Sequence, residues 1–204
     1  MTSHPKDAHV ELFKAMRSLE NVCEHLHLPL QSGSDKILKL MNRKYTSAHY
    51  LKLVDDYRKI VPGGSITTDI LVGFPSETEA DFKKTYNLMK RVNFDSAFTF
   101  KYSPRPPAKS ASLKDSVSPE AKARRLTDVI TLQCKSSQAC NEAEIGKTLE
   151  VLVEGTSRKS RSMLNGRTRA NKMAVFAGAE SLIGQVVHVQ IISVTPYALK
   201  GRIV

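Results

Sequence analysis

The stretch Ser65-Ile-Thr-Thr-Asp-Ile-Leu-Val-Gly-Phe-Pro-Ser-Glu-Thr78 combines a strand, a break and the start of a helix. Residues 65–72 form a nearly continuous β-rich run, which is typical of a strand that is covered on both faces. Gly73-Phe-Pro75 ends this strand, and Thr78 is a favourable cap for a helix whose apolar side chains recur at helical spacing. The stretch therefore predicts one strand-to-helix unit of an α/β sheet.

Units of the same kind lie on both sides of this stretch. Leu26, Leu28 and Leu30 alternate with other residues in a short strand over 23–30, and Pro29 marks its end. Because strands and helices alternate at this spacing, they predict right-handed βαβ units on a parallel sheet. We expect helices over residues 7–20, 34–41 (capped by Ser34) and 46–61 (opened by Thr46), and a further strand over 94–102.

The amino-acid composition changes after Tyr102. Residues 103–116 are rich in Pro, Ser and Lys and predict a loop, whereas Ser118-Pro-Glu120 is a strong start for a long helix. From Gly146 the pattern is all-β, and five short strands predict a small closed barrel. The expected strands are 148–153, 163–169, 173–176, 186–194 and 199–204, and the expected domains are 1–142 and 143–204.

The charge is strongly positive, with 31 Lys and Arg against 20 Asp and Glu and a net charge of +11. Such an excess suits a polyanionic partner, although a merely basic soluble enzyme is an equal alternative. Six cations crowd into two strands and their loop, and they predict an RNA-binding face, with a solubilising hairpin as the alternative. These cations are Arg158, Lys159, Arg161, Arg167, Arg169 and Lys172.

Cys23, Cys134 and Cys140 fit neither a disulfide framework nor a zinc site, and we expect free thiols in a reducing compartment. His25 and His27 share one face of a strand, where packing is favoured over metal ligation. The chain holds no phosphate-binding G-x-x-x-x-G-K-[ST] loop and no G-x-S-x-G motif. No secretory signal or membrane-spanning run is present, so we expect a cytoplasmic protein without a membrane partner.

Several long motifs occur in one order along the chain. They are Thr2-Ser-His-Pro-Lys-Asp7, His25-Leu-His-Leu-Pro-Leu-Gln-Ser-Gly-Ser34 running into Met41-Asn-Arg43-Lys-Tyr45, Thr67-Thr-Asp-Ile-Leu-Val-Gly-Phe-Pro-Ser-Glu-Thr-Glu79, and Phe94-Asp-Ser-Ala-Phe-Thr-Phe-Lys-Tyr-Ser-Pro-Arg-Pro106. The tail adds Gly146-Lys-Thr148 and Gly166-Arg-Thr-Arg-Ala-Asn-Lys172. Together these motifs resemble the tRNA methylthiotransferase branch of the radical S-adenosylmethionine (SAM) enzymes, and those of the tail resemble the TRAM domain of that family.

The resemblance implies a half radical-SAM barrel, similar to a TIM barrel, followed by an OB-like TRAM barrel. It implies radical insertion of a methylthio group at C2 of an adenine beside the anticodon of tRNA. The strand from Phe94 and the Gly166 motif look most like the enzyme for isopentenyladenosine, and a sister enzyme for threonylcarbamoyladenosine is the alternative. The complete enzyme would use SAM and two [4Fe-4S] clusters and would bind the tRNA anticodon stem-loop.

The C-x-x-x-C-x-x-C motif that holds the radical cluster in this family is missing from the sequence. We therefore expect a C-terminal part that lacks the N-terminal half of the enzyme and is inactive alone. An RNA-binding module without catalysis and a self-associating structural remnant are the alternatives.

The resemblance also implies five cofactor-binding residues: Gln31, Arg43, Asp69, Gly73 and Glu77. The guanidinium of Arg43 suits the methionine carboxylate of SAM, while Gln31 and Asp69 suit the ribose hydroxyl groups. Gly73 would allow the adenine to approach the backbone, and Glu77 would orient that loop. As alternatives, Arg43 is a cation at a helix end and Asp69 caps a neighbouring element.

Overall fold

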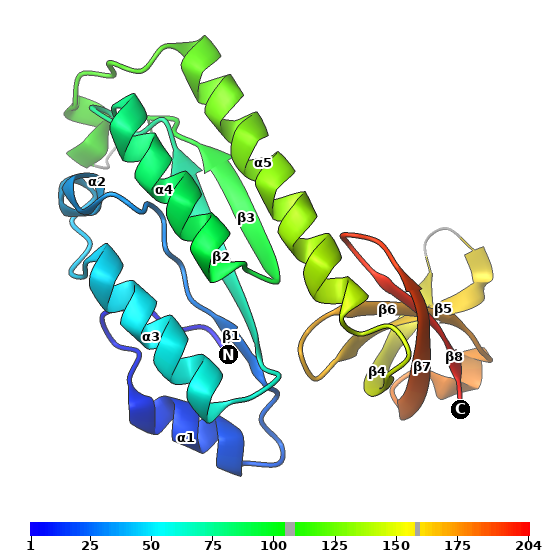
Figure 1. The fold of residues 1–204 in the computed structure, drawn as a ribbon. Helices are drawn as coiled ribbons and strands as arrows, with labels where there is room; N and C mark the ends of the chain where they lie inside the picture. Colours follow the sequence, from blue (N-terminus) through cyan, green and yellow to red (C-terminus); the bar gives the residue numbers. More distant parts are fainter. Residues whose placement is uncertain (105–108, 158–159) are drawn as a thin grey trace.

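The computed structural model describes residues 1–104, 109–157 and 160–204, and it divides them between an α/β part and a barrel (Figure 1). The α/β part has a three-stranded parallel sheet in the order β1-β2-β3. Its elements are α1 (Val10–Ser18), β1 (His25–His27), α2 (Asp35–Leu40), α3 (Ser47–Ile60), β2 (Ser65–Val72), α4 (Glu79–Val92), β3 (Ser96–Lys101), a 3₁₀ turn (Lys109–Ser112) and α5 (Pro119–Glu142).

The parallel sheet confirms the alternation of strands and helices that the sequence predicts. Strand β2 pairs with β1 from His25 opposite Ser65, and with β3 from Thr67 opposite Ser96. A further parallel bridge joins Thr2 to His27 beyond β1. Both edges of β2 are therefore paired, which makes it the middle strand of the sheet.

Three of the four expected helix caps are made as predicted. The hydroxyl groups of Thr46, Thr78 and Ser118 each accept a backbone N–H group of the first turn, and Thr78 forms a capping box with Asp81. Ser34 precedes α2 but does not cap it with its side chain, which corrects the sequence prediction. Its hydroxyl group instead donates to Asp81 Oδ1 of α4 over 2.7 Å, a partner that is distant in sequence.

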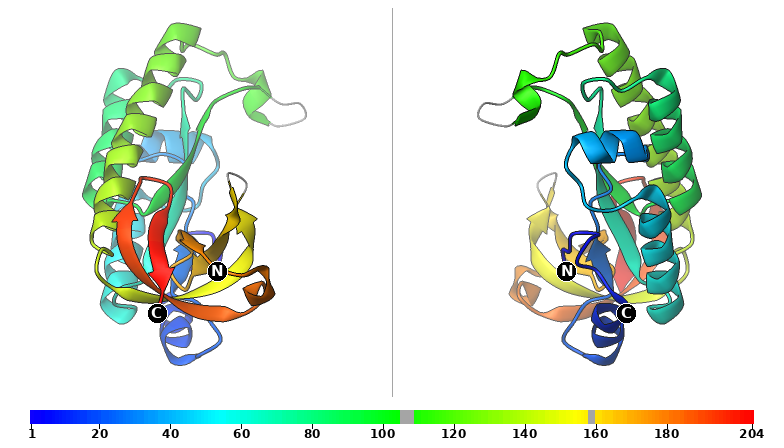
Figure 2. Two further views of the ribbon diagram at one scale, coloured as in Figure 1. Left: turned by 90° about the vertical axis from the view of Figure 1, so that its right-hand side faces the viewer. Right: turned by 90° about the vertical axis from the view of Figure 1, so that its left-hand side faces the viewer.

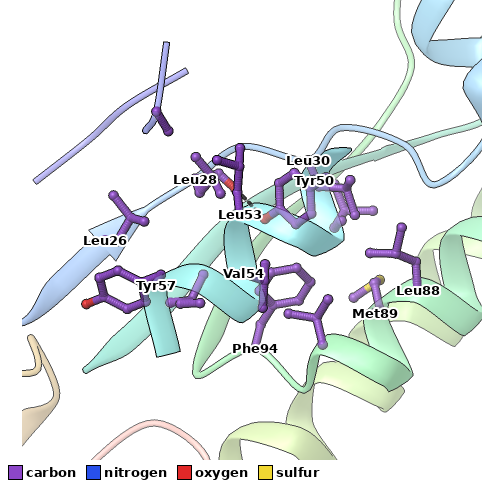
Figure 3. Packing of buried hydrophobic residues seen from close by; sticks show 14 of the residues in the cluster. Leu26, Leu28, Leu30, Tyr50, Leu53, Val54, Tyr57, Leu88, Met89 and Phe94 are labelled. Atoms are coloured by element: carbon purple, nitrogen blue, oxygen red, sulfur yellow. Dashed lines mark hydrogen bonds between the residues drawn. The ribbon is translucent and has the colours of Figure 1, made fainter. Parts of the chain in front are cut away.

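All of the long helices cover the same face of the sheet, as the perpendicular views in Figure 2 show. Leu26, Leu28 and Leu30 are completely buried beneath α3, together with Tyr50 and Phe94 (Figure 3). The hydroxyl group of Tyr50 donates to the carbonyl oxygen of Leu28 over 2.7 Å, so its polar end is satisfied within this core. The same cluster contains Phe13, Val54, Tyr57, Ile66, Phe82 and Met89.

The opposite face of the sheet is open in the part of the chain that the structure describes. Ile66, Ile70 and Val72 of β2 face the helices and are buried, whereas Thr67, Asp69 and Leu71 on the other face are only half-buried. On β3, Phe98 and Phe100 are 62% and 51% exposed. The expectation that β2 is covered on both faces is therefore wrong for the open side.

The five-stranded closed barrel confirms the second architecture that the sequence predicts. Its core contains Val151, Val153, Leu164, Phe176 and Val189. Gly166 and Gly201 let neighbouring strands approach, because a Cβ atom there would lie within 2.5 Å of a carbonyl oxygen. The closed order β4-β5-β6-β8-β7 joins β4 (Thr148–Ser157), β5 (Ser160–Thr168), β6 (Met173–Ala177), β7 (Val186–Val194) and β8 (Leu199–Ile203), with a 3₁₀ turn (Glu180–Leu182) between β6 and β7.

No helix among the described residues has the length and apolar character needed to cross a membrane.

Replacing Tyr50 with Phe should lower the free energy of unfolding by about 1 kcal/mol, because a buried hydrogen bond to Leu28 is removed. Urea denaturation followed by circular dichroism measures this change. Tyr86→Phe is the matched control on α4, since the ring of Tyr86 is only partly buried. Equal stabilities of the two variants would contradict the role given to the Tyr50 hydroxyl group.

Candidate functional site

A cavity of about 890 Å³ opens at the carboxyl end of the sheet. Gln31 and Arg43 line it together, so two of the expected cofactor-binding residues meet in space. Parallel α/β sheets bind ligands at this end, because the loops that follow the strands converge there. The other lining residues are Leu40, Met41, Asn42, Leu71, Phe74, Phe100, Lys101, Tyr102, Ser103 and Ser110.

Gln31 is held in place by the edge of β2. Its N–H group donates to the carbonyl oxygen of Asp69 over 2.7 Å, and its carbonyl oxygen accepts the N–H group of Leu71 over 2.9 Å. These two hydrogen bonds form an isolated parallel bridge between Gln31 and β2. Gln31 has a positive φ of 65°, which is uncommon for a residue other than glycine and is held here by the bridge. The chain therefore leaves the sheet at Gln31, beside the cavity.

Arg43 reaches the cavity from the segment that follows α2. Its N–H group donates to the carbonyl oxygen of Leu38 over 2.8 Å, and Asn42 takes a positive φ of 57° where the helix ends. Within the described residues the guanidinium forms no salt bridge and is half-buried. Arg43 therefore contributes a planar cation to the cavity lining, which suits a carboxylate or phosphate ligand.

The apolar wall of the cavity comes from residues that the sequence interpretation missed. The rings of Phe74 and Tyr102 meet edge to face with their centroids 5.1 Å apart, and both pack with Ile37. Phe74 lies inside the Gly73-Phe-Pro75 break, and Tyr102 follows β3 directly. The available signal was an aromatic residue directly after each of two predicted strands, at the end of the sheet where ligands bind.

Asp69 does not line the cavity. It lies on the open face of β2, two residues before Leu71, and its Oδ1 atom is 3.5 Å from His27 Nε2. His25 and His27 share this face as predicted, and a nitrogen of each ring lies 2.9 Å from the hydroxyl oxygen of Thr67. Burial lowers the pKa of His25 to about 4, so this histidine is neutral at physiological pH.

Gly73 and Glu77 lie outside the cavity lining and stabilise the turn that carries Phe74. Glu77 Oε2 accepts the Gly73 N–H group over 2.7 Å and an N–H of Arg125 of α5 over 2.7 Å. Burial raises the pKa of Glu77, although both of these partners favour its ionised form. Gly73 has a φ of +73°, and the aliphatic chain of Lys122 occupies the space beside its Cα atom.

The structure describes the side chains of three of the six predicted RNA-binding cations, and these three do not share one open face. Arg158 and Lys159 lie outside the described residues, and the side chain of Arg161 is also outside the description. Arg167 is 3.7 Å from Glu154 and remains partly exposed. The side chains of Arg169 and Lys172 point toward the α/β part, where they contact Glu24 and Asp95, respectively.

All three cysteines are free, with Cys23 exposed and the other two partly exposed. Among the residues that the structure describes, no group of three His, Cys, Asp or Glu side chains is arranged to hold a metal ion. The described part of this chain therefore offers no fit for an iron–sulfur cluster. The cavity and the basic barrel remain as its candidate functional features.

Comparisons with known proteins agree with both parts of the fold. Residues 1–89 match the family model of the radical SAM superfamily, and residues 142–204 match that of the TRAM domain. The chain is 50% identical over 204 residues to the tRNA-2-methylthio-N(6)-dimethylallyladenosine synthase of Thermoanaerobacter sp. (strain X514), with all of this chain and 43% of the relative covered. The protein of the same name from Moorella thermoacetica is 48% identical, with 46% of it covered.

The chain thus spans less than half the length of these curated relatives. Among solved structures, the coproporphyrinogen III oxidase of Escherichia coli, a radical SAM enzyme, matches with a TM-score of 0.56 at 17% identity. The match covers 82% of this chain and 45% of the oxidase, and it confirms the α/β fold.

Replacing Arg125 with Met should destabilise the fold by about 3–5 kcal/mol, because the buried carboxylate of Glu77 would lose its charged partner. The adjacent Arg124 supplies the matched control, since its side chain is 51% exposed against 6% for Arg125. Arg124→Met should destabilise the fold far less, because exposed ion pairs contribute little. Thermal and urea unfolding of the two variants measure the difference, and similar losses of stability would contradict the buried role of Arg125.

Proposed function

We propose that this chain, a member of the tRNA methylthiotransferases of the radical SAM superfamily, is the C-terminal part of an enzyme that modifies an adenosine beside the tRNA anticodon. The observation that carries the proposal is the convergence of Gln31 and Arg43 on one cavity in a chain of this family. The relatives named above act, by their names, on dimethylallyladenosine. We therefore favour the isopentenylated adenosine over the threonylcarbamoylated one as substrate.

We assign SAM to this cavity, whose volume of about 890 Å³ lies in the range of small-molecule sites. We assign the guanidinium of Arg43 to the methionine carboxylate and the side chain of Gln31 to the ribose. Phe74 and Tyr102 provide an apolar wall suited to the adenine ring. When bound, SAM would supply the radical and the methyl group, while these residues bind and orient it.

We assign supporting roles to Asp69, Gly73 and Glu77, which do not line the cavity. Asp69 belongs to the same face of β2 as Leu71 and would meet the part of a ligand that extends along the open face. Glu77 holds the backbone of Gly73, and through it the turn that presents Phe74. We assign the ligands of the two [4Fe-4S] clusters to the remainder of the complete enzyme.

We assign tRNA binding to the barrel, and we treat residues 1–142 and 143–204 as the two domains. Nine Lys and Arg against three Asp and Glu over residues 146–204 favour a polyanionic partner. Small β-barrels of this kind commonly bind oligonucleotides. A tRNA substrate also favours the cytoplasm as the location of the protein.

The second candidate function is an RNA-binding module without catalysis. It is favoured for the isolated chain because no iron–sulfur cluster fits the described residues. The two candidates differ in whether the chain binds SAM.

Replacing Arg43 with Ala should weaken SAM binding by roughly 10-fold or more, because a charged hydrogen bond to the carboxylate is removed. Isothermal titration calorimetry of the chain with SAM measures this effect. Lys44→Ala removes an exposed neighbouring cation and serves as the control. An unchanged dissociation constant for Arg43→Ala would exclude the assignment, and absence of SAM binding in the unmodified chain would favour the RNA-binding module.

Replacing Arg158, Lys159 and Arg161 with Ala should weaken tRNA binding and lower its salt dependence by about one unit of log–log slope for each phosphate that is no longer neutralised. Filter binding at several salt concentrations measures both effects. The control removes the same charge from the exposed surface of α4, through Lys83, Lys90 and Arg91. If the two triple variants bound equally, the hairpin would have no specific part in RNA binding.

A further inference from the structure

One turn of the barrel contacts the beginning of every strand of the sheet. This docking turn, Thr168–Lys172, connects β5 to β6. In the α/β part it contacts Glu24, Ser65 and Asp95. Glu24 immediately precedes β1, Ser65 starts β2, and Asp95 immediately precedes β3. The three contacts follow the order of the strands in the sheet.

Arg169 makes the contact beside β1. Its Nε and Nη2 atoms donate to the two carboxylate oxygens of Glu24 over 2.8 and 3.0 Å. The Nη2 atom also donates to the carbonyl oxygens of Glu20 and Val22, each over 3.0 Å. A guanidinium in this two-point geometry fixes direction as well as distance. The hydrogen bond from Arg169 lowers the pKa of Glu24, so the pair is fully ionised at neutral pH.

Lys172 makes the contact beside β3. Its ammonium group lies 3.1 Å from Asp95 Oδ1, 3.1 Å from the carbonyl oxygen of Cys140 and 3.0 Å from Asn141 Oδ1. It donates to the latter two oxygens and forms an ion pair with Asp95, and the side chain is only 10% exposed. Between these two cations, the carbonyl oxygen of Ala170 accepts the hydroxyl group of Ser65 over 2.7 Å.

We propose that the docking turn holds the barrel in one orientation at the amino end of the sheet, with Arg169 and Lys172 as positioning residues rather than RNA ligands. A phosphate would have to displace these contacts to reach Lys172, whose side chain is buried against them. The RNA part of this proposal rests on the tRNA-binding function proposed above. The docking part stands on the contacts alone.

The first test compares how the two parts of the chain tumble in solution. In the unmodified chain, backbone ¹⁵N relaxation should give one rotational correlation time for the barrel and the α/β part. The double variant Arg169→Ala with Lys172→Ala should shorten the correlation time of the barrel toward that of a free small domain. The matched control, Lys200→Ala with Arg202→Ala, removes two exposed barrel cations and should leave one common value. Independent tumbling in the unmodified chain, or common tumbling in the double variant, would overturn the proposal.

A charge exchange separates positioning from RNA contact. Arg169→Glu should both loosen the barrel and weaken tRNA binding, whereas Arg169→Glu combined with Glu24→Arg should restore a common correlation time and recover tRNA affinity. A direct RNA ligand at position 169 would predict no recovery of affinity, because the exchanged residue is an acid. If the charge-exchanged variant regained a common correlation time but not its tRNA affinity, the positioning role would be overturned. Absence of tRNA binding in the unmodified chain would instead contradict the proposed function, while the relaxation result would still decide the docking.

Discussion

The structure depends on strand β2, because three separate features take their position from its backbone. The strand pairs with β1 on one side and with β3 on the other. At its carboxyl end it binds both polar groups of the Gln31 backbone, and at its amino end the N–H group of Ile66 donates to Asp95 Oδ2 over 2.9 Å. The candidate cofactor cavity and the barrel contact are thus aligned to the same eight-residue strand.

Helix α5 provides a second connection between these two regions. Near its start, Arg125 pairs with Glu77 and supports the turn beside the cavity. Near its end, Asn141 donates to the carbonyl oxygen of Thr195 in the turn between β7 and β8, and it accepts from Lys172. At about 1.5 Å per residue, this continuous helix of 24 residues spans roughly 36 Å and so reaches both regions.

Sequence patterns predicted the elements well, because strands and caps are local properties. The bounds of β2 and β7 and the caps at Thr46, Thr78 and Ser118 depend on residues only a few positions apart. The failures are all long-range. The Ser34 hydroxyl group is taken by a residue 47 positions away, and Arg169 binds a carboxylate 145 positions away. No periodicity in the sequence carries that information, so the basic cluster was predicted to form one surface, although Arg169 and Lys172 face the α/β part.

The cavity and the docking turn lie at opposite ends of the sheet, separated by the length of β2. Eight residues of strand span roughly 26 Å. A residue in the cavity wall and a residue in the docking turn are therefore too far apart to contact one small ligand at the same time.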